Sequence, residues 1–535
     1  MSQTDHSLSL ASPVPRQFNA LQRIGLASVG GGLALFIVAI FGAASAREGS
    51  FFWGAISLIS LGGIAFSWST YMQEAAGIKN NGVMFFSETA RGALGWVFGV
   101  FITTFYVLLY FYADALGADL DSSDGIHNTG LVALFDPLSY LLKGEPASQW
   151  FMYGTFYTLS ILVLGFKYIL KYRHSRYHVI RTSSVMFFQT SFAFLIPEFM
   201  ARLNQTTELK ASGLTVPYYD FKNVWPLNYY NFQGYRVDTM TDPTFNDITH
   251  NLGFIMLLVG VGSVFIISPI LTYFFGKRWY CSWVCGCGGL AETAGDSFRH
   301  LSDKSLNAWR IERWLIHSVL AFVVIMTIAT VYAYLKDNGA DYWINADVFV
   351  GLVSTTLLGL TIALWTRKRL FATIQRDVKI VASILMVAIT GLTIYTHLMD
   401  SRLVFFAEPY KIYSLYGFLI GNIFSGVIGV GFYPLMGSRV WCRFGCPMAA
   451  ILGLQQRFFS RFRITTNGGQ CISCGNCSTY CEMGIDVRAY AQRGQNIVRA
   501  SCVGCGVCAA VCPRGVLSLE NGPNTDNSRM DEVRY

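Results

Sequence analysis

The chain has 535 residues, of which 53% are hydrophobic, 13% are charged and 13 are cysteines, and its formal net charge is +8. Soluble globular proteins carry roughly a quarter of their residues as Asp, Glu, Lys and Arg, so this composition excludes a soluble protein and indicates many membrane spans. The high aromatic content, the aperiodic glycines and the clustered cysteines also exclude a disordered chain, a collagen-like repeat and a disulfide scaffold.

Ten apolar stretches are long enough to cross a bilayer, because a transmembrane helix needs about 20 mostly apolar residues. We predict helices near residues 24–46, 50–72, 92–116, 150–170, 184–200, 252–275, 314–335, 346–365, 380–398 and 413–436. The fifth is short and is interrupted by Pro197 and Glu198. The alternating pattern of membrane β-strands is absent. The predicted fold class is therefore an all-α polytopic membrane protein, with a small α+β ferredoxin domain at the C-terminus.

The distribution of Lys and Arg predicts the orientation, because positively charged loops stay on the cytoplasmic side. With the N-terminus inside, 31 of the 40 basic residues fall in inner segments and nine in outer ones. The net charge is thus a topology signal and does not indicate nucleic-acid binding. We expect a multi-pass protein of the bacterial cytoplasmic membrane with both termini inside. Cleavage of the first span as a signal peptide after Ala44-Ser45-Ala46 is the alternative, but its apolar run is longer than such a core usually is.

The segments between and after the spans define the expected domains. They are a cytoplasmic N-terminus (1–23), a five-span bundle (24–200), an outer aromatic loop (201–250), a second five-span bundle (251–463), a ferredoxin-like domain (464–520) and a disordered tail (521–535). Within the first bundle, GLVALFDPLSYLLKG is typical of an interfacial or re-entrant helix broken at Pro137. The Tyr and Trp residues of the outer loop fit an interfacial belt or a docking surface equally well.

Two cysteine runs in the C-terminal domain have the spacing of bacterial ferredoxins that hold two cubane clusters. Residues 471–481 read CISCGNCSTYC and residues 502–512 read CVGCGVCAAVC, each C-x2-C-x2-C-x3-C. In such ferredoxins the last Cys of each run ligates the other cluster. We therefore assign one [4Fe-4S] cluster to Cys471, Cys474, Cys477 and Cys512, and the second to Cys502, Cys505, Cys508 and Cys481. The alternatives are four-thiolate zinc sites and disulfides, which a reducing cytosol disfavours.

A second cysteine pattern occurs twice, after the sixth and tenth spans. GKRWYCSWVCGCG at 276–288 and GSRVWCRFGCPMA at 437–449 share Gly, Arg at the third position, an aromatic residue before the first Cys, and C-x3-C. We predict that these pairs face each other at the inner membrane edge and hold a third iron–sulfur centre through Cys281, Cys285, Cys442 and Cys446, with Cys287 as an alternate ligand. The competing interpretation is a set of reduced, buried thiols that act as small hydrophobic residues.

The paired motifs followed by a ferredoxin-like tail resemble the NosR- and NapH-type family of membrane polyferredoxins. The resemblance depends on CSWVCGCGGLAE at 281–292, CRFGCPMAAILG at 442–453, AEPYKI at 407–412 and the two tail motifs. It implies membrane-bound electron transfer, commonly with the quinol pool and a partner reductase, or support of metalloenzyme maturation. Two departures stand out. Gly286 follows Cys285 where the family pattern has proline, and the outer flavin domain of NosR-type members is missing.

Other cofactors find no support in the sequence. Only His317 and His397 lie within predicted spans, near opposite faces, so no pair of axial haem ligands is expected. His174 and His178 fit interfacial contacts better than ligands. No flavin attachment sequence S/T-G-A-T and no nicotinamide-binding G-x-G-x-x-G after a strand is present.

These features predict an electron-transfer subunit of a quinol dehydrogenase-like membrane complex. Electrons would pass between the ferredoxin domain, the membrane-edge cysteine site, and quinone or partner redox subunits. The sequence offers three continuations of this route: a quinone site near the inner edge, completion by partner subunits, or a cysteine centre deeper than the motif positions suggest. An accessory protein that reduces or delivers metal for a respiratory enzyme is the alternative function. The inner face is basic, and Arg439, Arg443, Arg457, Arg461 and Arg463 would be topogenic or would dock an acidic partner.

Overall fold

The computed structural model describes residues 18–41, 49–73, 76, 92–119, 127–206, 219–232, 255–256, 258–338, 344–368, 371, 374–401 and 403–522. The expected N-terminal segment up to residue 17, the possible cleavage site at 44–46 and the expected disordered tail from residue 523 lie outside the described residues.

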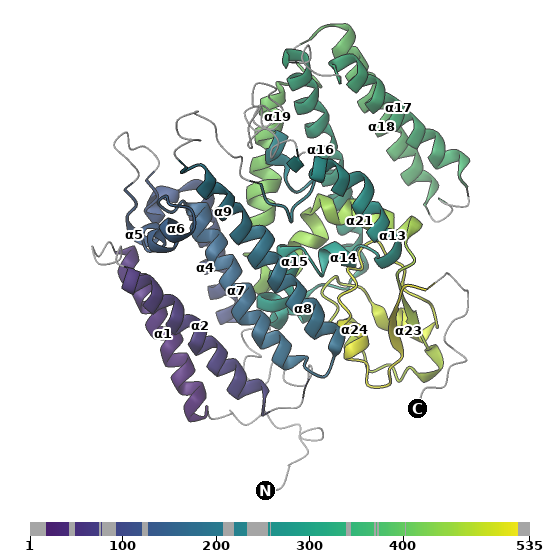
Figure 1. Ribbon diagram of the computed structural model, residues 1–535. Coiled ribbons are helices and arrows are strands. Elements are labelled where there is room, and N and C mark those ends of the chain that lie inside the picture. Colours follow the sequence, from purple (N-terminus) through teal and green to yellow (C-terminus); the bar gives the residue numbers. More distant parts are fainter. Residues whose placement is uncertain are drawn as a thin grey trace.

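Ten helices of the described chain are long and apolar enough to cross a membrane, which confirms the predicted number and the helical fold class. They are α1 (Ala20–Ile40), α2 (Gly49–Tyr71), α4 (Ala93–Phe111), α7 (Gln149–Lys171), Arg176–Leu203, Leu258–Phe275, α16 (Leu306–Asn338), α17 (Ala346–Thr366), α18 (Arg376–Leu398) and Pro409–Ile428. The helices α1 and α2 lie together along α7 on one side, and α17 and α18 form a second hairpin on the other (Figure 1).

The fifth span is longer than predicted, mainly because it begins at Arg176 instead of residue 184, and the expected interruption at Pro197 does not occur. The span consists of α8 (Arg176–Phe188), a π-helical stretch (Gln189–Leu195) and α9 (Ile196–Leu203). Pro197 lies in the first turn of α9, directly after the π-helical stretch, so the helix continues past it. The π-helical stretch begins at Gln189, whose side chain is buried and donates to Thr158 Oγ1 on α7 at 3.1 Å.

The apolar segment before α7 is broken at Leu134 and Phe135, just before the expected position at Pro137. It forms α5 (Gly130–Ala133) and α6 (Asp136–Leu142), with Pro137 in the first turn of α6. Phe135, between the two helices, is fully buried, and its ring lies 4.9 Å from that of Phe156 on α7. This segment is therefore part of the bundle core.

Within the predicted outer loop, the described segment Tyr219–Phe232 folds into the bundle. Trp225 Nε1 donates to Thr327 Oγ1 on α16 at 3.0 Å, and Asn223 Oδ1 accepts from the Tyr280 hydroxyl at 3.1 Å. The ring of Tyr229 lies 5.0 Å from that of Tyr416 on α19 (Pro409–Tyr416). These contacts make this part of the loop an inserted wall of the second bundle, not an interfacial belt.

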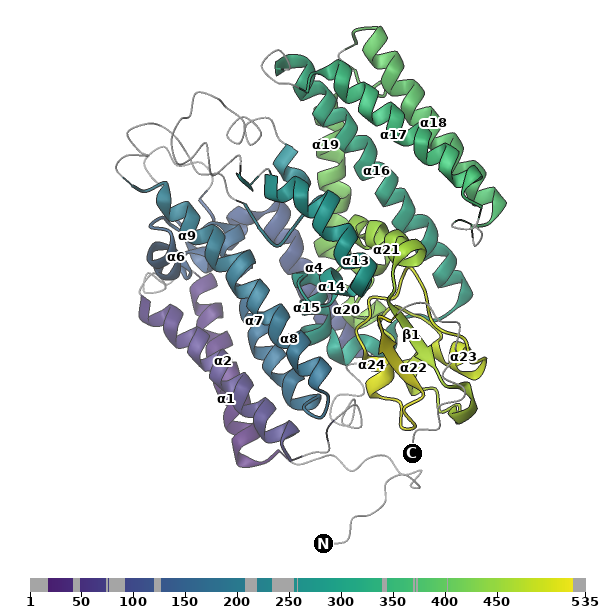
Figure 2. The same ribbon diagram turned by 45° about the vertical axis from the view of Figure 1, so that its right-hand side comes forward.

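The C-terminal region is a small α+β unit that packs against one end of the bundle, beneath α13 (Ser268–Phe275) and α21 (Pro447–Phe459) (Figure 2). Its strands β1 (Arg463–Thr466) and β2 (Leu517–Glu520) pair antiparallel, with Arg463 opposite Glu520 and Thr466 opposite Leu517. The short helices α22 (Asn476–Thr479), α23 (Val487–Gln492) and α24 (Val507–Ala510) carry or flank the cysteine runs.

Candidate iron–sulfur centres

The two cysteine runs of the tail fold into matching loops. Ser473 and Gly504, at equivalent positions, have φ angles of 59° and 62°, and Gly475 and Gly506 both have φ of 81°. Left-handed residues turn the chain sharply, so each loop bends around its first cysteines before α22 or α24 begins. Equal spacing in the sequence thus produces equal backbone shape.

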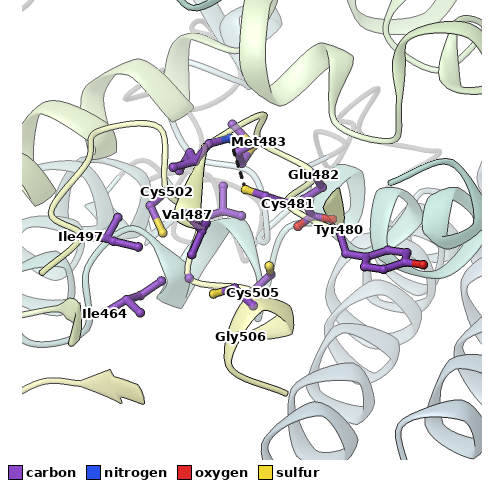
Figure 3. A pocket seen from close by; sticks show the side chains of 14 residues that line it. Ile464, Tyr480, Cys481, Glu482, Met483, Val487, Ile497, Cys502, Cys505 and Gly506 are labelled. Carbon is purple, nitrogen blue, oxygen red and sulfur yellow. Dashed lines mark hydrogen bonds between the residues drawn. The ribbon is translucent and has the colours of Figure 1, made fainter. Parts of the chain in front are cut away.

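One cavity of the ferredoxin-like domain is lined by Cys481, Cys502, Cys505 and Cys508, the four cysteines assigned to the second cluster (Figure 3). Apolar side chains close its walls, among them Ile464, Val487 and Ile497. The Ile485 N–H donates to Cys481 Sγ at 3.4 Å. Four thiols around one apolar cavity fit a cubane cluster, and N–H···S bonds of this kind tune its reduction potential.

The remaining tail cysteines gather around Cys477. Burial, together with the nearby thiols of Cys512, Cys474 and Cys471, raises the pKa of Cys477 to about 11. The Val516 N–H donates to Cys512 Sγ at 3.3 Å, matching the bond from Ile485 to Cys481 in the other run. Cys512 is therefore near the first run although it ends the second, and the crossed assignment stays a prediction. Within the described residues, no three His, Cys, Asp or Glu side chains meet around the position of a single ion.

The paired motifs also come together. Cys281 ends α14 (Arg278–Cys281), Cys285 precedes α15 (Gly286–Thr293), Cys442 lies in a π-helical turn (Trp441–Gly445), and Cys446 precedes α21. All four are 6% exposed and belong to one apolar core. Burial and the thiols of Cys442, Cys281 and Cys285 raise the pKa of Cys446. The helix caps are equivalent too, because Cys285 and Cys446 are both extended N-cap residues.

Cys287 lies in the same site. Its thiol and the ammonium of Lys222 both lie close to Cys285. The four paired cysteines and Cys287 thus form one compact group of thiols. A thiolate is the form that binds iron, so the donor set fits an iron–sulfur centre.

Cys285 lies beside the middle of two spans, deeper than the inner edge at which the sequence places the motif, whereas Ser282, next to Cys281, contacts the ferredoxin-like domain. A Cβ added to Gly286, next to Cys285, would lie 2.4 Å from Gln189 Oε1 and 3.1 Å from Tyr157 Cε1. Gln189 and Tyr157 are each about 20 Å along their spans from the end nearest the ferredoxin-like domain, at 1.5 Å per residue. The chain after Phe275 turns back between α7, α8 and α13 as α14 and α15 (Figure 1). Hydropathy alone does not detect such a return.

A buried ion network joins the ferredoxin-like domain to the membrane bundle. Glu482, directly after Cys481, pairs with Arg299 Nη1 at 2.8 Å and with Arg439 Nε at 3.1 Å. Arg439 Nη2 also pairs with Glu292 at 2.7 Å. Further ion pairs extend the network: Arg181–Glu292 at 2.7 Å, Arg299–Asp296 at 3.0 Å and Lys171–Asp296 at 2.5 Å. Although burial opposes ionisation, Arg299 and Arg439 hold the pKa of Glu482 below its usual range.

Arg439 connects this network to the paired cysteines. Its Nη1 donates to the Cys281 carbonyl at 3.1 Å and lies 3.7 Å from Cys442 Sγ. Arg439 is 1% exposed and Arg443, which pairs with Glu312 at 2.8 Å, is 3% exposed. These two arginines and the buried Arg463 therefore do not form the exposed basic face that the sequence analysis expected; Arg457 and Arg461 are exposed.

Direct hydrogen bonds connect the loop of the second cluster with the membrane motifs. Ser282 Oγ, next to Cys281, donates to the Val503 carbonyl at 2.8 Å. Gln456 Nε2 on α21 donates to the Cys502 carbonyl, and the Tyr177 hydroxyl to the Gly504 carbonyl, both at 2.8 Å. Arg181 donates to the Cys505 carbonyl. The loop is thus bonded to three parts of the bundle: the segment between α14 and α15, α21 and α8.

Several of these residues were not predicted from the sequence. Glu482 follows the last cysteine of the first run, where no motif marks it, and Lys222 lies in the predicted outer loop. The sequence did contain a signal for Glu482, namely a carboxylate directly after a cluster cysteine. Such a carboxylate is costly to bury, so its position indicates that cations surround it. His178 is buried against this same domain, where a Cβ on Gly506 would lie 3.5 Å from its ring, which agrees with a contact role.

Comparison with known families supports the iron–sulfur character of both regions. A family described as a 4Fe-4S dicluster domain matches residues 470–517, which contain all eight tail cysteines. A family described as a 4Fe-4S binding domain matches twice, at residues 257–305 and 419–465, the segments that carry the paired motifs. No curated protein and no solved structure matches the chain. The chain is therefore a multi-span membrane protein with 4Fe-4S ferredoxin-type domains.

The crossed ligand assignment predicts which substitutions affect the same cluster. Cys512→Ser and Cys474→Ser should alter one ferredoxin-type signal, whereas Cys481→Ser and Cys505→Ser should alter the other. Electron paramagnetic resonance of the reduced protein distinguishes the two signals. If Cys512→Ser changed the same signal as Cys505→Ser, the crossed assignment would be wrong.

Glu482→Gln should loosen the ferredoxin-like domain from the bundle. Removing one member of a buried ion pair leaves its partners uncompensated and costs about 3–5 kcal/mol. Limited proteolysis after α21 and thermal loss of cluster absorbance measure this effect. The control is Glu408→Gln, whose exposed pair with Lys411 at 3.2 Å contributes about 0–1 kcal/mol. Equal proteolysis of the two variants would contradict a docking role for Glu482.

Proposed function

We propose that the protein is a membrane electron-transfer subunit in which electrons move between the ferredoxin-like tail and the paired-cysteine site inside the bundle. The observation that carries this proposal is the bond from Ser282 to the Val503 carbonyl, which joins a loop of each site at 2.8 Å. Iron–sulfur clusters held at these sites would supply one-electron chemistry. The residues named above hold and insulate them, and the surrounding hydrogen bonds and charges set their potentials.

The exposure of the cysteines indicates which end of the proposed electron route faces solvent and which end faces the bundle. Cys474 is exposed, and the adjacent Ile472 is 57% exposed, so the first run faces solvent. Cys502 and Cys508 are buried, and their cavity lies against the bundle. A soluble redox partner would therefore reach the loop at Ile472–Cys474, and the paired cysteines would be the far end of the route.

The charge distribution supports placing the tail on the cytoplasmic side of a bacterial inner membrane. The basic residues concentrate on the side of the spans that carries the tail. The ferredoxin-like domain and both termini then face the reducing cytosol, where thiols remain free to bind iron.

A cavity beside the paired cysteines offers an exit for electrons to a small apolar carrier. It has a volume of about 220 Å³ and lies among α4, α7 and α15. Aromatic side chains dominate its lining, including Tyr106, Tyr153, Tyr157 and Tyr433. An apolar pocket with a few hydroxyl groups suits a quinone head group. A partner redox subunit is the other acceptor consistent with the site, and either would make this chain a component of an oxidoreductase complex.

Iron and sulfide content tests the third centre. The tail clusters account for about eight irons per chain, four for each cubane. We expect the purified protein to contain more than this, and Cys446→Ser to reduce the content to about eight while both tail signals persist. A wild-type content of about eight would show that the paired cysteines hold no iron.

Filling the tyrosine-lined cavity tests the exit. Ala294→Phe places a ring in the cavity and should slow quinol-dependent reduction of the clusters at least about tenfold, because displacing a bound head group costs more than 1.4 kcal/mol. Reduction by dithionite should be unchanged. Ala388→Phe, on the exposed face of α18, is the matched control. Unchanged quinol-dependent rates in Ala294→Phe would place the acceptor elsewhere.

A further inference from the structure

We propose that Lys222 is the charge-compensating residue of the paired-cysteine centre and raises its reduction potential from the side opposite the ferredoxin-like domain. This inference rests on the proposed function, because it requires a centre at the paired cysteines. It concerns a residue that no motif marks and that the chain delivers from a segment between the fifth and sixth spans.

The position of Lys222 is the first observation. The inserted segment Tyr219–Phe232 carries it into the bundle, where its side chain is 8% exposed. Its Nζ donates to Gln189 Oε1 at 2.8 Å, about halfway along the fifth span. An ammonium at such depth is costly unless a negative group lies nearby. A bonded amide oxygen is neutral and does not offset that cost alone.

The surroundings of Lys222 contain no direct ion pair. Among the described residues, no carboxylate forms a salt bridge with its ammonium, although Asp220 lies two residues away. The carboxylate of Asp220 instead accepts from the Lys222 backbone N–H at 2.9 Å and from Asn223 Nδ2 at 2.6 Å. Arg439, on the other side of the cysteines, is already shared between Glu292 and Glu482. Lys222 is therefore a buried cation beside Cys285 that no salt bridge neutralises, with the Asp220 carboxylate as its nearest opposite charge.

The third observation is the departure of the first cysteine motif from the second. Proline follows Cys446, whereas Gly286 follows Cys285. A Cβ on Gly286 would lie 2.7 Å from Lys222 Nζ, inside the contact distance that real side chains keep. A side chain at residue 286 would push the ammonium away from the backbone beside Cys285. The absence of proline after Cys285 thus leaves the space that the Lys222 ammonium occupies.

A fixed positive charge stabilises the reduced centre more than the oxidised one, because reduction adds negative charge. Its removal should therefore lower the midpoint potential. We expect Lys222→Met to change the one-electron equilibrium constant of the paired-cysteine centre by about tenfold, which corresponds to about 59 mV. The potentials of the two tail clusters should remain unchanged, since Lys222 contacts neither.

The experiment is a redox titration of the purified full chain, monitored by electron paramagnetic resonance. Lys222→Arg keeps the charge and should retain the wild-type potential, which separates the charge from a packing role. Lys336→Met removes a lysine that pairs with Asp400 at the far end of α16 and is the control for lost charge.

Three outcomes decide the inference. A lower potential in Lys222→Met, restored in Lys222→Arg, supports it. A third signal whose potential is unmoved in Lys222→Met overturns the inference and leaves the proposed function intact. Absence of any third signal and an iron content of about eight in the wild type would overturn both.

Discussion

The buried ion network around Glu482 is the interaction on which the rest of the arrangement depends. It contains three carboxylates (Glu292, Asp296, Glu482) and four cations (Lys171, Arg181, Arg299, Arg439) from the bundle, the returning loops and the tail. Burying these charges is costly, and hydrophobic residues of similar volume would often be as stable. What the network supplies is a fixed register, because Glu482 meets its two arginines in one docked position. The network has one more cation than carboxylates, and this extra positive charge is favourable between two groups of thiolates.

The two cysteine motifs of the bundle are related by repetition but have diverged in their charged neighbours. Arg278 and Arg439 occupy equivalent positions in the repeat. Arg439 reaches Cys442 and the ion network, whereas Arg278 stacks on Phe462, with its guanidinium 4.6 Å from the ring centre. The first motif has its own buried cation, Lys277, near Cys281, and a second, Lys222, near Cys285 comes from a different part of the chain. The repeat thus preserves the thiols and varies the electrostatics, which is how one ligand set can be adjusted to different potentials.

Local rules in the sequence were sufficient for the spans and the tail. Ten spans follow from apolar length, and the cysteine spacing with its left-handed turns predicts the duplicated loops. The internal repeat predicts that Cys281, Cys285, Cys442 and Cys446 meet, and in the structure all four belong to one apolar core; that they hold iron stays a prediction. Their depth was not predictable, because α14 and α15 re-enter the bundle through contacts between residues distant in sequence, such as Val185 with Leu290. Lys222 and Glu482 could not be predicted for the same reason, because the residues that surround their charges are far away in the sequence.

In the proposed function, the position of Cys285 among the spans gives the bundle a part in electron transfer. A centre that includes Cys285, beside the middle of the fourth and fifth spans, would divide the proposed route into two shorter steps. The inner step would follow the hydrogen bond between Ser282 and the Val503 carbonyl. The outer step would begin where the tyrosine-lined cavity borders the thiols. The inserted segment Tyr219–Phe232 therefore explains why polar residues lie in the middle of the bundle. Together with the cavity, it would give a terminal acceptor access to the thiols.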